Sequence, residues 1–203
     1  MPQLSLFAAS ETVLALADDA RGRIAYTPRF VAAPTAHAWF AELRARVAWK
    51  AERRRMYDRE VDVPRLTAHF DLELEDGAVP EVIASAAREV VAATGVPFNS
   101  VGLNLYRDGR DSVAPHHDHL NAIVEGFPIA LLSLGATRRM VIRAQEPPRR
   151  VLHVDLEPGS LLMMSYATQL HYLHGVPKTT APVGERISLA LRVKPQAPRG
   201  FYG

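Results

Sequence analysis

The chain has 203 residues, enough for one domain with a sizeable core, and we expect a single folded unit. Apolar residues make up 48% and charged residues 23%, values typical of globular proteins, which exclude a disordered, collagen-like or coiled-coil chain. The absence of cysteine excludes disulfides, cysteine-ligated zinc, iron–sulfur clusters and thiol nucleophiles. A metal site in this protein must therefore be built from histidines and carboxylates.

The positive charge is carried mostly by arginine. The formal net charge is +2, and the only lysines among the 24 cationic residues are Lys50, Lys178 and Lys194. Arginines cluster at 53–55 and again at Arg138, Arg139 and Arg143. Guanidinium groups suit phosphate, so these clusters are candidates for nucleic-acid contacts, and solvated surface charge is the alternative.

The chain carries no membrane or export signal that we can detect. Residues 1–7 lack the basic leader and long apolar stretch of a signal peptide, and no apolar run approaches the roughly 20 residues that cross a bilayer. We therefore expect a cytoplasmic protein without membrane contact.

The first half of the chain predicts two amphipathic helices. Trp39, Phe40, Leu43 and Val47 recur at helical spacing, which predicts a helix from Thr35 to about residue 54. A second helix is expected from about Pro80 to Thr94, with proline in its first turn and Gly95 just past its end.

Beyond Gly95 the period changes to that of strands. Val101, Leu103 and Leu105 alternate with Gly102, Asn104 and Tyr106, which predicts a strand with one apolar and one polar face. Further strands are predicted at 129–134, 139–144, 151–156, 160–164 and 186–193, separated by proline- and glycine-containing turns. No helix separates these strands, so we expect a mainly β fold, a β-sandwich or jelly roll with flanking helices, rather than a parallel α/β sheet.

Two candidate metal ligands lie two residues apart. His116 and Asp118 leave the same face of an extended segment, whereas His117 and His119 point the other way and are either substrate contacts or surface residues. The candidates for a third ligand are His153, His171 and His174. We favour His174, because the turn at 175–177 can deliver its ring from a strand end, and we expect His171 to pack or to line the pocket.

Two histidines and one carboxylate leave three coordination positions open, which is typical of non-haem Fe(II) oxygenases. Such a metal needs a co-substrate. In the last strand the odd-numbered residues 187–193 are apolar, and the opposite face carries Arg186 and Arg192. A buried arginine beside a pocket indicates a carboxylate partner. Asn104 and Tyr106 could orient the same carboxylate.

The ordered set of these motifs resembles the AlkB family of Fe(II)/2-oxoglutarate dioxygenases, and most closely its branch that repairs alkylated DNA. The resemblance is best from about Pro97 to Val193. The motifs are Asn104-Leu105-Tyr106-Arg107-Asp108-Gly109, His116-His117-Asp118, residues 159–164, Tyr172-Leu173-His174-Gly175 and residues 186–192.

The resemblance implies a fold and a set of roles. The expected fold is a double-stranded β-helix, in one domain over 1–203, with a helical and substrate-lid region at 1–96 and a catalytic core at 97–195. By position in the motifs, His116, Asp118 and His174 correspond to the ligands of Fe(II). The 2-oxoglutarate pocket corresponds to Asn104, Tyr106, Arg186, Ser188 and Arg192, with Arg186 on the distal carboxylate. O2 is the remaining co-substrate.

Two departures from the family concern the substrate. DNA-repair members carry a carboxylate two positions after the motif aspartate, and Leu120 occupies that position here. The segment 63–71 resembles the start of the recognition lid, but the hairpin that should follow is shortened to 72–77. His69 and Phe70 are candidates for stacking on a base, with Phe70 in the core as the alternative, and His119 is a third candidate contact.

The function that this resemblance implies is oxidative demethylation of N-alkylated bases in DNA or RNA, with release of formaldehyde, succinate and CO2. The expected partner is alkylated nucleic acid, single-stranded or with a flipped base, and the expected state is a monomer. Two alternatives remain. One is the same oxygenase chemistry on a protein or a small molecule; the other is a zinc hydrolase or metal-binding jelly roll, which would leave Arg186 without a task.

Overall fold

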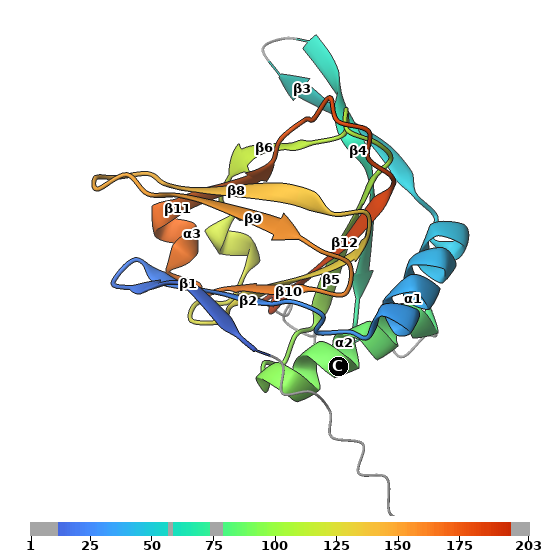
Figure 1. Ribbon diagram of the computed structural model, residues 1–203, viewed down its shortest axis with the longest axis horizontal. Helices are drawn as coiled ribbons and strands as arrows, with labels where there is room; N and C mark the ends of the chain where they lie inside the picture. The colour runs from blue at the N-terminus through green and yellow to red at the C-terminus, as the bar shows by residue number, and fades with distance from the viewer. Residues whose placement is uncertain (1–11, 57–58, 74–78, 196–203) are drawn as a thin grey trace, which may run out of the picture.

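The computed structural model describes residues 12–56, 59–73 and 79–195, which form a twelve-stranded β fold with its two longer helices on one side (Figure 1). An eight-stranded sheet holds most of the strands, in the order β1-β2-β10-β7-β12-β5-β4-β3. Its strands are β1 (Leu14–Asp19), β2 (Gly22–Thr27), β3 (Lys50–Met56), β4 (Arg59–Asp71), β5 (Ser100–Tyr106), β7 (Ile129–Gly135), β10 (Leu161–Met164) and β12 (Arg186–Arg192).

A smaller sheet faces the larger one. Its order is β6-β11-β8-β9, made by β6 (Val113–His116), β11 (Tyr172–Val176), β8 (Arg138–Ala144) and β9 (Val151–Leu156). Within the described part of the chain, the paired strands of both sheets are all antiparallel. The two facing sheets confirm the predicted jelly roll.

Helices cover the outer face of the larger sheet. α1 (Ala33–Arg46) and α2 (Glu81–Thr94) pack there, and the short α3 (Thr168–His171) precedes β11 (Figure 1). A 3₁₀ turn, η1, covers Leu120–Ala122. In α2 the expected boundaries hold, since Pro80 is the N-cap and Gly95 ends the helix in the left-handed conformation.

The prediction for the first helix was wrong at its C-terminal end. α1 stops at Arg46, and Val47 is already extended. The apolar spacing that predicts the helix also ends at Val47, which is buried, and the residues from Lys50 onward pair with β4 instead. Tertiary strand pairing therefore overrides the helical continuation to residue 54.

The two faces of the larger sheet belong to two different apolar clusters. Its outer face packs against α1 and α2 through Val101, Leu103, Ile187 and Leu189. Its inner face, with Tyr106, Leu131 and Ala190, packs in a second cluster with Met140 of the smaller sheet. The alternation predicted for residues 101–106 and 186–193 is thus confirmed, and the inner face is the one that can hold a site.

The region before residue 97 contributes strands as well as helices. β1 to β4 were not expected, and residues 63–71, which resemble the start of a lid, form the second half of β4 and pair with β5 over Leu66–Asp71. Of the expected short hairpin at 72–77, residues 74–77 lie outside the described residues. Among the described helices, none is long and apolar enough to cross a membrane.

Gly159 provides a test of how tightly the turn before β10 is packed. It has a φ of +74°, and an added Cβ would collide with the carbonyl oxygen of Val31, whereas Gly95 has a φ of +68° and open space around it. We expect Gly95→Ala to lower the free energy of unfolding by about 1 kcal/mol through backbone strain. Gly159→Ala should lower it by about 3 kcal/mol, because the collision adds to the strain.

Denaturant unfolding of the two variants and the parent chain measures both effects. Equal destabilisation by the two alanines would contradict the packing that the structure assigns to Gly159.

Candidate metal and co-substrate site

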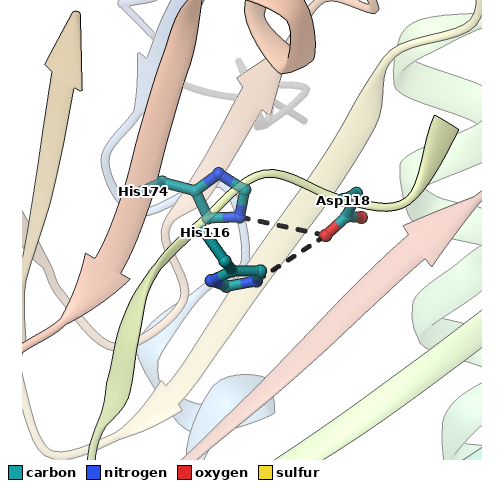
Figure 2. A group of neighbouring side chains, drawn as sticks. All are labelled: His116, Asp118 and His174. Atoms are coloured by element: carbon teal, nitrogen blue, oxygen red, sulfur yellow. Dashed lines mark ion pairs between the residues drawn. The ribbon is translucent and has the colours of Figure 1, made fainter. Parts of the chain in front are cut away.

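Two adjacent strands of the smaller sheet bring the predicted histidines together. β6 and β11 are antiparallel neighbours, and His116 lies directly opposite His174 in their register. Asp118 follows β6 by two residues. Figure 2 shows that the three side chains turn toward one another although 58 residues of chain (174 minus 116) separate the histidines.

The geometry of this group fits a small metal ion. The Nε2 atoms of His116 and His174 lie 3.8 and 4.0 Å from Oδ1 of Asp118 (Figure 2). One ligand atom from each of the three residues lies within 4.8 Å of the others. The Asp118 and His174 side chains are 9% and 7% exposed and that of His116 is 43% exposed, so the group is open on one side.

Hydrogen bonding and burial keep these side chains in the protonation states that bind metal. Nδ1 of His116 donates to the carbonyl oxygen of Ala114 at 3.0 Å, which leaves its Nε2 lone pair free. Burial lowers the pKa of His174 to about 4, with a further contribution from His116. Burial also lowers the pKa of His116.

Asp118 is held from two sides. Its backbone N–H donates to Oε1 of Gln169 at 3.0 Å, and its Oδ2 accepts from Nε of Arg192 at 2.5 Å. Burial opposes the charged carboxylate, yet the Arg192 guanidinium holds the pKa of Asp118 below its ordinary value. Arg192 therefore fixes the carboxylate while Oδ1 remains directed at the histidines.

The other histidines of the sequence lie elsewhere. His174 is in the middle of β11 rather than at a strand end, so the expected turn at 175–177 does not position it. The pairing of β11 with β6 on one side and with β8 on the other does. His171 ends α3, and His153 lies exposed on β9. His117 and His119 are exposed, and none of these four lines the cavity described next.

A cavity of about 240 Å³ extends from the histidines across the inner face of the larger sheet. Every even-numbered residue of β12 lines it, as the alternation predicts: Arg186, Ser188, Ala190 and Arg192. From β5 it is lined by Gly102, Asn104 and Tyr106 together with Leu103. The structure thus brings all five predicted co-substrate residues to the cavity that contains His116 and His174.

Arg186 carries a buried charge that the protein only partly satisfies. It is 1% exposed, and its Nη2 donates to Oγ of Ser133 at 2.8 Å. Its Nε and Nη1 have no hydrogen-bond partner, and none of the described carboxylates pairs with it. Burial lowers the pKa of this guanidinium. An unpaired buried guanidinium is costly, so these two N–H groups fit a carboxylate of an organic acid that enters the cavity.

Arg138 is a second buried arginine, which lies against the same tyrosine ring as Arg186. Arg138 donates to the carbonyl oxygens of Asp108, Asp111 and Pro177 at 2.8 to 2.9 Å. The guanidinium carbons of Arg138 and Arg186 lie 5.5 and 5.1 Å from the centre of the Tyr106 ring. Neither alternative given for Arg138, phosphate contact or solvated surface charge, holds, because the side chain is buried and its Nη1 and Nη2 donate to backbone carbonyls.

The other arginines of the two predicted basic clusters lie at the surface where the structure describes their side chains. Arg139 pairs with Asp155 through two hydrogen bonds of 2.7 and 2.8 Å. Arg143 is exposed on β8, and Arg53 is exposed on β3. The side chains of Arg54 and Arg55 lie outside the described residues.

Neither of the aromatic stacking candidates lines the cavity. Phe70 packs against the outer apolar cluster, as the core alternative predicts. His69 is exposed, with its Nε2 3.2 Å from Nζ of Lys194, and burial together with Lys194 lowers its pKa.

Three polar residues of the cavity lining were missed by the sequence analysis. Arg65 donates from Nε to Oδ1 of Asn104 at 2.6 Å, and Thr67 donates to Oε1 of Glu52 at 2.6 Å. Arg65, Thr67 and Glu52 all line the cavity. Arg65 and Thr67 belong to the segment that resembles the lid, which was the available signal. Near Glu52 the only signal was the arginine cluster at 53–55, which did not indicate a role for a carboxylate.

A jelly roll with two histidines and a carboxylate at an open cavity defines a class, the metal-dependent oxygenases with three free coordination positions. Comparison with known proteins agrees. The model of the 2OG-Fe(II) oxygenase superfamily matches residues 72–192. The fold is similar to "The structure of OsALKBH1", with a TM-score of 0.60 and 15% identity, over 90% of this chain and 100% of that one.

Relatives found by sequence comparison identify the family within this superfamily. Alpha-ketoglutarate-dependent dioxygenase alkB homolog 3 of Bos taurus is 32% identical over 197 residues, 89% of this chain and 69% of that protein. DNA oxidative demethylase ALKBH2 of Bos taurus is 36% identical over 118 residues, 55% of this chain. The chain spans 42% of the length of that ALKBH2. The protein therefore belongs to the AlkB family within the 2OG-Fe(II) oxygenase superfamily, and the cofactors of that superfamily, Fe(II), 2-oxoglutarate and O2, are those expected from the sequence.

His174→Ala tests the metal site. We expect the variant to lose at least about tenfold in affinity for Fe(II), or for Mn(II) as a redox-inert probe, because one of three ligands is gone. His171→Ala is the matched control, a histidine three positions away that lies outside the cavity, and it should bind metal as the parent chain does. Calorimetric titration measures both, and a stronger loss in His171→Ala would reassign the third ligand.

Arg186→Lys tests the co-substrate pocket. Lysine keeps the charge but loses the planar pair of donors, so we expect the KM for 2-oxoglutarate to rise by about tenfold or more. Steady-state succinate formation measures it, and a circular dichroism spectrum confirms folding. Arg139→Lys, on the same protein's surface, should leave the KM unchanged. An unchanged KM in Arg186→Lys would contradict the assignment.

Proposed function

We propose that this protein is an Fe(II)/2-oxoglutarate dioxygenase that removes N-linked alkyl groups from bases of DNA, with RNA as a second nucleic-acid substrate. One observation carries the proposal: His116 and His174, whose ligand atoms lie within 4.8 Å of that of Asp118, line the same cavity as Arg186, whose Nε and Nη1 have no hydrogen-bond partner. A zinc hydrolase would use the three ligands but would leave the buried guanidinium of Arg186 without a carboxylate partner.

The proposed roles follow from the side chains. His116, Asp118 and His174 would hold Fe(II), which when bound activates O2 for oxidation of 2-oxoglutarate to succinate and CO2. Arg186 would bind the distal carboxylate of 2-oxoglutarate, and Asn104, Tyr106 and Ser188 would line its binding site. Arg192 holds the Asp118 carboxylate ionised and oriented, so that its Oδ1 is available as a ligand.

The reaction on the substrate is balanced by the co-substrates. One oxygen atom of O2 enters succinate, and the other enters a C–H bond of the N-methyl group. The resulting hydroxymethyl group loses its carbon as formaldehyde, and the ring nitrogen or exocyclic amine is restored. The protein supplies position, because the cavity walls must hold the methyl carbon beside the metal.

A nucleic-acid substrate is supported by the relatives and by the shape of the site. The relative of 36% identity is a DNA oxidative demethylase. A cavity between two sheets cannot admit a paired base, so the substrate would be single-stranded or would present a flipped base. The monomeric state, the cytoplasmic location and the single domain, with a substrate-side region at 1–96 and a core at 97–195, belong to the same proposal.

Turnover of methylated oligonucleotides tests the proposal. With Fe(II), 2-oxoglutarate and ascorbate, we expect formaldehyde and succinate in equal amounts from single-stranded DNA that contains N1-methyladenine or N3-methylcytosine. The same sequence in a duplex should react more slowly, because unstacking costs a few kcal/mol.

The unmethylated oligonucleotide is the control and should yield no formaldehyde. Succinate formation without formaldehyde from any methylated DNA or RNA would keep the oxygenase class and reject nucleic acid as the substrate.

A further inference from the structure

One acidic side chain lines the cavity where β3 and β4 form its wall. Among the described residues that line the cavity, Glu52 is the only carboxylate, and it comes from β3. Asp118 belongs to the metal group and is bound by Arg192. Glu52 takes no part in the binding of metal or 2-oxoglutarate proposed above.

An irregularity in strand pairing lies at Glu52. Ala51 pairs with Leu66, but Arg53 pairs with Asp62, so the register between β3 and β4 shifts at Glu52. Opposite this point β4 carries Pro64, which has no N–H for the ladder, and the carbonyl oxygen of Pro64 accepts from the backbone N–H of Ser112 instead. Irregularities of this kind redirect side chains near active sites.

Thr67 fixes the carboxylate of Glu52 in the cavity wall. Its Oγ1 donates to Oε1 of Glu52 at 2.6 Å. Thr67 lies opposite Asn104 on β5, and Asn104 lies opposite Ser188 on β12. Glu52 is thus joined to a row of polar side chains that runs across the inner face of the larger sheet toward the co-substrate residues.

The other charged side chains that line the cavity are arginines, Arg65, Arg186 and Arg192. Arg192 is paired with Asp118, and the two negative charges of bound 2-oxoglutarate would offset the two positive charges of Fe(II), so Arg186 leaves an excess of positive charge. A neutral substrate group could enter such a cavity without a counter-charge. A cationic group would be repelled by these charges unless a carboxylate stood beside it, and Glu52 is the described lining residue that can supply one.

We propose that Glu52 is the residue that recognises the positive charge of the alkylated base, and that it selects cationic over neutral lesions. The inference rests on the proposed function. Adenine methylated at N1 and cytosine methylated at N3 are cations that keep an exocyclic amine, so the carboxylate can accept a hydrogen bond from the base and neutralise it. The sequence departs from the DNA-repair branch at Leu120, which lies in η1, and Glu52 supplies a carboxylate from strand β3 instead.

A matched pair of substrates tests the proposal. N3-methylcytosine and N3-methylthymine carry the same methyl group at the same ring position, but only the first is cationic and only the first has an exocyclic amine. Both are placed in the same single-stranded sequence, and kcat/KM for formaldehyde release is measured for the full chain and its variants.

Glu52→Gln removes the charge and keeps an oxygen that can accept from Thr67. We expect kcat/KM for N3-methylcytosine to fall about tenfold or more, which is the effect of losing one charge-assisted hydrogen bond, and kcat/KM for N3-methylthymine to stay within about twofold or rise. Glu89→Gln, an exposed acid on α2, is the control and should leave both values unchanged.

Thr67→Val separates recognition from structure. If Glu52 acted only by tying β3 to β4, Thr67→Val would lower both substrates equally and Glu52→Gln would change neither, and that pattern would overturn the proposal. An equal loss on both substrates in Glu52→Gln would overturn it as well. If the parent chain forms succinate but releases formaldehyde from neither oligonucleotide, the proposed function fails, and the role of Glu52 fails with it.

Discussion

The separation of the two faces of β12 is the constraint on which the site depends. β12 lies between β5 and β7, so both of its edges are used by the sheet and its side chains can leave only outward or inward. The outward residues close the apolar cluster under the helices, and the inward ones carry two guanidiniums into the cavity. A shift of one residue would exchange the two sets, which would bury charge in the core and strip the cavity of its cations.

The arrangement of His116, Asp118 and His174 depends on another strand pairing, that of β6 with β11. His116 and His174 meet because β6 and β11 are neighbours, and the strand β8 on the other side of β11 fixes the register. The backbones of both histidines are therefore held in the paired strands of the smaller sheet. Arg192 then joins the two sheets at the site, since it leaves β12 in the larger sheet and holds Asp118, which follows β6 of the smaller one.

Local patterns in the sequence were enough to predict much of the fold and of the candidate site. The alternation in 101–106 and 186–193 predicted both faces of the central strands, and the motif order predicted the ligand group and its cofactors. The first helix was overextended, because its end is set by pairing of Lys50 with Thr67, which no local period encodes. Arg138 was misassigned because three backbone carbonyls bind it only in the fold. Glu52 and Arg65 reach the cavity through a shifted register between β3 and β4, which is invisible before the strands are paired.

The position of β3 at the border of the larger sheet has a consequence for how this enzyme could diversify. β3 is bonded to one strand only, β4, while the residues proposed to bind 2-oxoglutarate lie on β5 and β12 in the interior of the sheet. A border strand tolerates exchanges and insertions that an interior strand does not. Because Glu52, the residue proposed to select the substrate, lies on this border strand, its replacement in descendants of this protein would alter substrate selectivity and leave the interior strands unchanged.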